Sequence, residues 1–140
     1  MTFSRIPWQA ATMEPARASA LTALRASSTR LAVSSQNVAN ARTGTALKDK
    51  TKIPEGVYAP LAVAQSSLEL GGVRVTVKEL DREPFIEHDD ASETGLAAFP
   101  AVNYAEETVN QAIALTSYKA AAAILRTGEE MDDALLDVKA

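Results

Sequence analysis

Two stretches near opposite ends of this chain decide its fold: Ser34-Ser35-Gln36-Asn37-Val38-Ala39-Asn40-Ala41-Arg42-Thr43, and Pro100-Ala101-Val102-Asn103-Tyr104-Ala105-Glu106-Glu107, the second followed by Thr116-Ser117-Tyr118-Lys119-Ala120. Each lies in or beside a segment whose apolar and small residues recur at helical spacing. These signatures indicate terminal helices that pair and assemble, rather than a pocket that carries out chemistry.

The N-terminal segment carries a seven-residue repeat that predicts a helix over residues 12–44. Leu24, Leu31 and Val38 recur every seven residues, with serines between them. This heptad-like pattern is typical of a helix that packs on another helix, and its small residues allow a close approach. Gly44 stands where such a helix would end.

The C-terminal segment predicts a second long helix, from about Tyr104 to about Val138. Asn103 is a suitable N-cap, and Glu106 three residues later resembles a capping box. A helix of this length would extend ~50 Å. Its predicted apolar stripe, with spacings of three and four, consists of Val102, Val109, Ile113, Thr116, Ala120, Ala123, Thr127, Met131, Ala134 and Val138.

Between the two helices, Gly71-Gly72 joins two alternating runs and predicts a β-hairpin with a two-residue turn. That register pairs Leu70 with Val73 and Leu68 with Val75, so apolar residues face apolar residues. The surrounding residues are rich in Pro, Gly and charge and are interpreted as loops.

The expected fold class is therefore mainly α with a small β insert. Long N- and C-terminal helices pair as a coiled coil, and a β-hairpin and loops lie between them. Residues 12–44 and 100–139 form a discontinuous helical assembly domain, residues 45–99 form the small hairpin and loop insert, and residues 1–11 form a flexible N-terminal segment.

Composition excludes several classes of protein. The net charge of −4 argues against nucleic acid as a partner, and the absence of cysteine excludes disulfides and thiolate metal sites. No apolar run approaches the roughly 18 residues that membrane insertion requires, and no cleavable signal peptide is recognised. We expect no cofactor and no enzymatic activity.

The chain's single histidine, His88, has acidic neighbours Asp89 and Asp90. One histidine beside acids in a loop is a weak metal signal, because a metal site needs three or four converging ligands. A metal-dependent enzyme centred on His88 is the least supported hypothesis, and a solvated turn is the preferred interpretation.

Asn37 and Asn40 lie three residues apart and so share one helix face. On spacing alone they are either a polar helix end or a pair of amides that bond the backbone of a neighbouring segment or subunit. The residues predicted to form subunit and assembly contacts are Leu24, Leu31, Asn37, Val38, Asn40, Asn103, Val109, Ile113, Tyr118 and Ala120. Two long helices and a hairpin bury little surface per residue, so assembly would supply the missing burial.

These segments resemble the bacterial flagellar basal-body rod protein family, most closely its proximal-rod members. Residues 35–43 are similar to the family's Asn-x-x-Asn-Ala-x-Thr signature. Residues 100–109 and 117–120 resemble its C-terminal block, and residues 72–75 with the acidic stretch after them resemble its hairpin and loop.

The resemblance implies a non-enzymatic structural subunit of the rod, which transmits motor torque across the periplasm for motility. Its partners would be itself, other rod subunits and the flagellar type III export apparatus, and it would be exported without a cleaved signal peptide. The competing hypothesis is a free cytoplasmic helical adaptor or export chaperone.

Overall fold

The computed structural model describes residues 8–49, 52–69 and 71–138. The elements in chain order are α1 (Trp8–Asn40), β1 (Thr45–Ala46), β2 (Leu61–Ser67), β3 (Val73–Glu79), β4 (Phe85–His88), β5 (Leu96–Phe99) and α2 (Tyr104–Asp137). Residues 8–11, predicted to precede the first helix, have helical backbone and belong to α1. The other residues of the predicted N-terminal segment, 1–7, lie outside the described residues.

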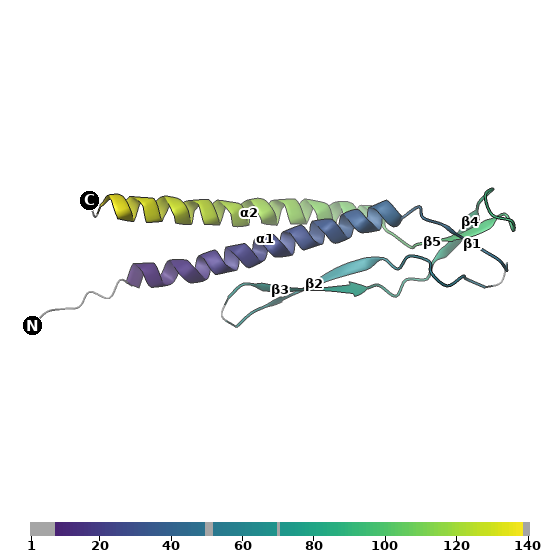
Figure 1. Ribbon diagram of the computed structural model, residues 1–140, viewed down its shortest axis with the longest axis horizontal. Coiled ribbons are helices and arrows are strands. Elements are labelled where there is room, and N and C mark those ends of the chain that lie inside the picture. The colour runs from purple at the N-terminus through teal and green to yellow at the C-terminus, as the bar shows by residue number, and fades with distance from the viewer. Residues whose placement is uncertain (1–7, 50–51, 70, 139–140) are drawn as a thin grey trace, which may run out of the picture.

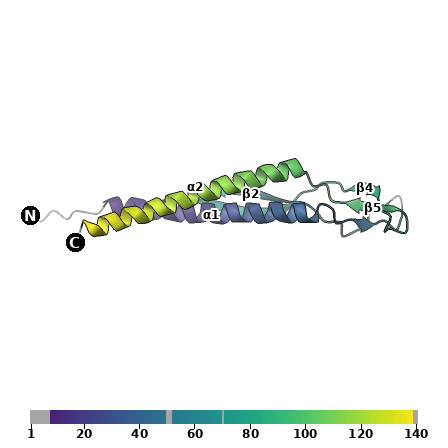
Figure 2. The ribbon, with the colours of Figure 1, turned by 90° about the horizontal axis from the view of Figure 1, so that it is seen from above.

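The molecule is elongated and layered. Figure 1 shows α1 and α2 side by side along their lengths, with the β2–β3 hairpin on the side of α1 away from α2. The view in Figure 2 shows α2 crossing α1, and in both views the sheet of β1, β5 and β4 lies beyond the helix ends. Among the described helices and strands, α1 therefore packs against α2, β2 and β3, whereas α2 packs against α1 alone.

Small residues form the seam between the helices. On α1 the buried residues Ala20, Ser27 and Ser34 recur every seven positions, and buried Ala41, directly after the helix, continues the series. On α2 the buried residues are Glu107, Ala114, Ala121 and Gly128, at the same interval. A seven-residue interval keeps side chains on one helix face, and side chains this small let the two backbones come close. At the far end, Arg17 of α1 and Asp132 of α2 form an ion pair at 2.7 Å.

The predicted stripes have the right period but the wrong phase. Val109, Ile113 and Met131 of α2 are exposed. Ile113 immediately precedes the seam residue Ala114, so its side chain is rotated by about 100° around the helix. The prediction followed the large apolar residues, whereas the interface between the helices is formed mainly by small ones.

The start of α2 follows the predicted cap. Asn103 accepts hydrogen bonds from the backbone N–H groups of Ala105 at 3.0 Å and Glu106 at 3.3 Å. The Glu106 carboxylate instead accepts a 2.7 Å hydrogen bond from Arg82. The helix then runs through Gly128 without a break, because this glycine is buried in the seam.

The β2–β3 hairpin exists, but its predicted register is wrong. Val73 pairs with Ser67 and Val75 with Gln65, so the strands are shifted by three residues. The connection runs from Leu68 to Gly72, because the Leu68 N–H donates to the Gly72 carbonyl at 3.1 Å and the Leu68 carbonyl accepts from the Gly71 N–H at 3.0 Å. Leu70 itself lies outside the described residues. The two strands are therefore joined by a longer loop with its own backbone hydrogen bonds, and not by the predicted two-residue turn.

The expectation of a mainly α protein with one small hairpin is also wrong. The structure combines two helices with five antiparallel strands in two sheets. In the second sheet β5 lies between β1 and β4, Ala97 and Ala98 are fully buried, and the rings of Phe85 and Phe99 stack at 5.9 Å. These strands have two to four residues, too short for a visible alternation pattern.

Candidate assembly site

Asn37 is the centre of a buried polar junction that joins both helices to the hairpin. Its side chain is 0% exposed. Its Nδ2 donates to the backbone oxygen of Leu61 at 2.8 Å and to Oε1 of Glu107 at 2.7 Å. Its Oδ1 accepts from the N–H of Leu61 and from the Tyr58 hydroxyl, both at 2.8 Å. The amide thus makes all four hydrogen bonds it can make.

Ser34, one turn before Asn37, extends this junction along the seam. Its hydroxyl donates to the backbone oxygen of Glu107 at 3.0 Å, and both residues are buried. Glu107 lies in the first turn of α2, where the positive end of the helix dipole favours a carboxylate. The junction therefore fixes the N-terminal turn of α2 against α1.

Tyr58 closes the junction from the loop before β2. Burial raises the pKa of the Tyr58 hydroxyl, and the negative charge of Glu107 raises it further. Both effects keep the phenol protonated. A protonated hydroxyl is the form that can donate to Asn37.

The two predicted asparagines have different roles. Asn37 bonds the backbone of a neighbouring segment of the same chain, Leu61. Asn40 donates to the backbone oxygen of Gln36 in its own helix at 2.8 Å and is not joined to the junction. Asn103 caps α2, one turn before Glu107. The structure thus brings Asn37 and the capped helix start together, with Glu107 as the link.

The remaining predicted contact residues lie away from the seam. Leu24 and Val38 are half-buried on the flank of α1, and Leu31 is exposed. On α2, Val109, Ile113, Tyr118 and Ala120 are exposed. The exposed side chains among them keep much of their surface uncovered by the described residues.

An apolar outer face follows α2 over six turns. We define the α2 outer face by its exposed large apolar residues, which are 45–56% exposed: Val109, Ile113, Ile124 and Met131. Tyr118 and Leu115 are similarly exposed on the other flank of the seam. Between Thr108 and Gly128 the sequence has two charged residues, Lys119 and Arg126. These two lie seven residues apart and share a different face, so the α2 outer face is free of charge over this span.

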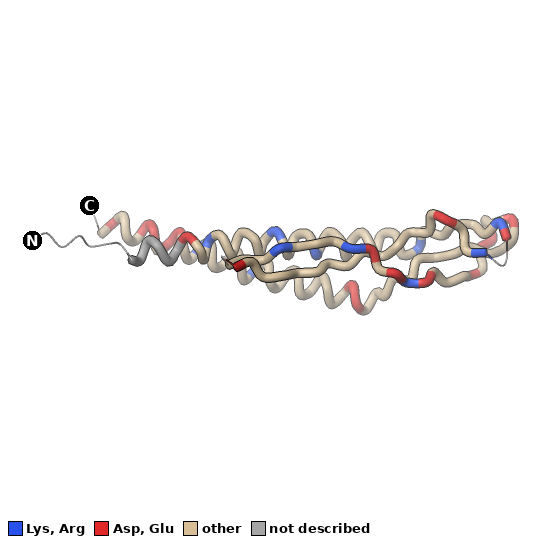
Figure 3. The backbone as a smooth tube through the Cα atoms, turned by 90° about the horizontal axis from the view of Figure 1, so that it is seen from below, with Lys and Arg blue, Asp and Glu red and all other residues tan. Residues whose placement is uncertain are grey.

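Charge is distributed unevenly along the molecule. No acidic residue occurs between Pro15 and Asn40 of α1 or between Thr108 and Gly128 of α2. Figure 3 accordingly shows no acidic residue along the middle of either helix, while the C-terminal end of α2 is strongly acidic. The helix pair therefore has a cationic middle and acidic ends.

A shallow apolar groove lies near the tip of the hairpin, between the two helices. Its walls are mainly small side chains: Ala16, Ser19, Ala20, Ala23, Gly72, Val73, Ser117, Ala120, Ala121 and Ile124. The hairpin tip is held on α1 at this point, because the N–H of Val73 donates to Oγ1 of Thr22 at 3.0 Å. The groove adjoins the α2 outer face, and Ile124 belongs to both surfaces.

His88 does not form a metal centre in the part of the chain that the structure describes. No group of three or more His, Asp or Glu side chains there could hold a metal ion. The His88 ring contacts Asp90 at 2.8 Å, and its side chain is largely exposed. Within the described helices, none is long and apolar enough to cross a membrane.

The sequence interpretation missed the role of Glu107 as the link in the junction, and it missed the hydrogen bonds of Ser34 and Tyr58. Glu107 was named only as the last residue of the stretch 100–107. A signal was present, because Glu107, Ala114, Ala121 and Gly128 recur every seven residues, as do Ala20, Ser27, Ser34 and Ala41. Following the small residues instead of the large ones would have found both sides of the seam.

Comparison with known proteins adds no relative. No family model matches the chain, and no curated protein matches it.

Proposed function

We propose that this protein is a structural subunit that assembles with copies of itself and related chains through its helices. The observation that carries the proposal is the outward position of the large apolar side chains of α2. Soluble monomers rarely expose a long charge-free apolar face, and such faces mark interaction sites. Seam residues such as Ala114 and Ala121 bury little area, so the helix pair gains most by covering this face in an assembly.

The two apolar surfaces favour a helical array over a closed dimer. A ridge formed by the α2 outer face of one copy fits a groove lined by small side chains on another. Because ridge and groove differ in every residue except Ile124, such a contact is heterologous and can continue from copy to copy. Many identical contacts along ~50 Å helices would make the array resist bending.

Within this class, we propose the proximal rod of the bacterial flagellar basal body, where the subunit would transmit torque across the periplasm for motility. The resemblance of residues 35–43, 100–109 and 117–120 to the rod protein family supports this choice. Other rod subunits would be its neighbours, and the flagellar type III export apparatus would deliver it without a cleaved signal peptide.

The decisive experiment compares Ile113→Asp with Ala64→Asp by analytical ultracentrifugation and electron microscopy of the purified full chain. Ile113 belongs to the α2 outer face, whereas Ala64 is exposed on β2 of the hairpin, away from that face. We expect the wild type and Ala64→Asp to form elongated assemblies and Ile113→Asp to remain monomeric with unchanged helix content.

A wild-type chain that stays a discrete monomer or dimer at all concentrations would overturn self-assembly and favour the adaptor or chaperone. The rod assignment has its own test in a motile bacterium that carries the gene. The chain should be found in purified basal bodies, and Ile113→Asp should abolish swimming while Ala64→Asp preserves it. A chain absent from basal bodies would overturn the rod assignment.

A further inference from the structure

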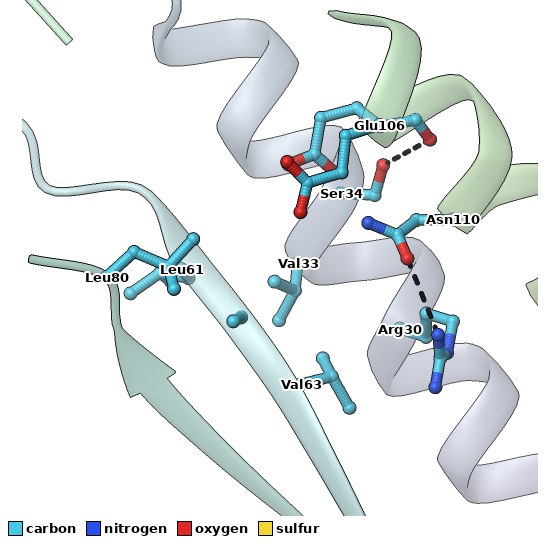
Figure 4. Close-up of a pocket in the computed structure, with 10 residues that line it drawn as sticks. Arg30, Val33, Ser34, Leu61, Val63, Leu80, Glu106 and Asn110 are labelled. Carbon is cyan, nitrogen blue, oxygen red and sulfur yellow. Dashed lines mark hydrogen bonds between the residues drawn. The ribbon is translucent and has the colours of Figure 1, made fainter. Parts of the chain in front are cut away.

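A narrow cleft opens where α1, the N-terminal turn of α2 and the hairpin meet. It encloses about 120 Å³. Figure 4 shows Arg30, Ser34, Glu106 and Asn110 on its helical side and the apolar side chains of Val33, Leu61, Val63 and Leu80 towards the strands. A lining that is polar on one side and apolar on the other suits a long side chain with a charged tip.

Glu107 gives this cleft an unsatisfied buried acceptor. The residue is 5% exposed and lines the cleft. Its Oε1 accepts from Asn37, but its Oε2 is buried with no hydrogen-bond partner. A buried carboxylate oxygen without a donor is strongly unfavourable, so a ligand with N–H groups would be bound here with a clear gain.

The charges that line the cleft favour a cation. They are one guanidinium, Arg30, and two carboxylates, Glu106 and Glu107. Arg30 donates to Oδ1 of Asn110 at 3.4 Å and, among the described residues, forms no ion pair with Glu107. Glu106 is already bonded to Arg82, which lies outside the lining. The Oε2 atom of Glu107 is therefore the acceptor left open.

We propose that this cleft binds a primary ammonium group at Oε2 of Glu107. Ammonium is a compact charge with three donors. The lining offers it Glu107 Oε2 as the open acceptor, and beside it lie the Glu106 carboxylate, bonded to Arg82, and Oδ1 of Asn110, bonded to Arg30. The group belongs to a lysine side chain whose methylenes lie along Leu61 and Leu80. The source of the lysine rests on the proposed function, and we assign it to a neighbouring copy in the assembly.

Lys119 is the lysine of this chain best placed to reach another copy. It is the one lysine in the described helices, it is exposed on α2, and no described residue forms an ion pair with it. It also lies in the cationic middle of the helix pair, which a staggered neighbour would bring towards the acidic start of α2.

The first experiment tests the cleft in the unassembled full chain. Isotope-labelled protein is titrated with n-butylammonium chloride, and the side-chain amide signals of Asn37 and Asn110 are followed by NMR. Tetramethylammonium chloride at equal ionic strength is the control, because it carries the charge without N–H donors. We expect saturable shifts with n-butylammonium only, and their loss in Glu107→Gln. This variant keeps an oxygen acceptor for Asn37 and removes the charge.

Glu106→Gln is the matched control, since it changes the adjacent carboxylate, which Arg82 already engages. It should keep saturable binding with at most a few-fold weaker affinity. Absence of saturable shifts in the wild type, or equal shifts with tetramethylammonium, would overturn the ammonium site and leave water as the occupant of the cleft.

The second experiment identifies the source through assembly. Glu107→Gln and Lys119→Gln should each raise the concentration needed for assembly at least about tenfold. The double variant should be no worse than either single one. Binding of n-butylammonium together with normal assembly of Lys119→Gln would support the ammonium site and overturn Lys119 as the source of the ammonium group. A wild-type chain that never assembles would contradict the proposed function, while the titration would still decide the cleft.

Discussion

The two long helices have nearly equal lengths but very different surroundings. α1 is packed on two sides, by α2 and by the β2–β3 hairpin, whereas α2 packs against α1 alone among the described helices and strands. Consequently α1 buries Asn37, Val33 and Ala26, while α2 leaves its largest apolar residues outside. The comparison teaches that α1 holds the chain together and that α2 carries the larger uncovered apolar surface.

The largest expected effect concerns the attachment of α1 to its two neighbours. Asn37→Ala removes four hydrogen bonds and leaves the Glu107 carboxylate and the Tyr58 hydroxyl without their partner. We expect the free energy of unfolding, measured by urea denaturation below the assembly concentration, to fall by about 3 kcal/mol.

Asn40→Ala is the matched control for this loss. Asn40 bonds its own helix and is partly exposed, so its replacement should change the free energy of unfolding by less than about 0.5 kcal/mol. Equal losses in the two variants would show that α1 owes its stability to helix packing and not to the junction.

The second prediction separates the inner and outer faces of α2. Ala114 is buried in the seam, and Ala114→Leu forces the helices apart at a cost of about 2 kcal/mol. Ala123 is exposed, and Ala123→Leu should leave the melting temperature of the monomer nearly unchanged. If Ala123→Leu destabilises the monomer as much, the outer face of α2 is not free in the isolated chain.

How much of this contrast the sequence could predict depends on the size of the residues involved. The C-terminal helix, its Asn103 cap and the presence of the hairpin followed from local rules. The seam did not, because Ala114, Ala121 and Gly128 carry a weak apolar signal beside Ile113 and Ile124. The three-stranded sheet was missed because its strands are short and interrupted by acidic turns.

The junction was predictable in one member only. Asn37 stood out because an amide on a helix face needs partners, and the proposed bond to a neighbouring backbone was one of two interpretations. Its partners Leu61, Tyr58 and Glu107 come from 21 to 70 residues further along the chain. Which distant groups meet depends on how the hairpin folds back on α1, and a single sequence does not encode that in any short pattern.

The third prediction tests the hairpin as the second support of α1. Gly72 has φ of +95°, and a Cβ added there would lie 2.6 Å from Oγ1 of Thr22 on α1. Gly56 has φ of +91° with no atom within 4 Å of an added Cβ. Both alanine variants carry the strain of a positive φ. Gly72→Ala should therefore lower the free energy of unfolding by about 1 kcal/mol more than Gly56→Ala.

Thermal melts of the two glycine variants measure this difference. Identical melting temperatures would mean that the hairpin tip rests on α1 without stabilising it. In that case the hairpin would not stabilise α1 at its tip. The difference between the two helices would then rest on the hydrogen bonds of the Asn37 junction alone.

The smallest expected effect is the alkaline response of the junction. The folded state raises the pKa of Tyr58 above its ordinary value of about 10, mainly through burial and then through the charge of Glu107. In the window above pH 10 the unfolded chain loses this proton more readily than the folded chain. The stability is therefore fully present below pH 10 and decreases as the pH rises through the folded pKa.

Tyr58→Phe removes this titration, whereas Tyr118→Phe alters an exposed ring on α2. We expect the melting temperature of the wild type and of Tyr118→Phe to decline more steeply above pH 10 than that of Tyr58→Phe. The difference isolates one hydroxyl on the α1 side of the molecule, because Tyr58 donates to Asn37 and has no described bond to α2. Parallel pH profiles for all three proteins would show that Tyr58 ionises as freely in the folded chain as in water, and the junction would then be open to solvent.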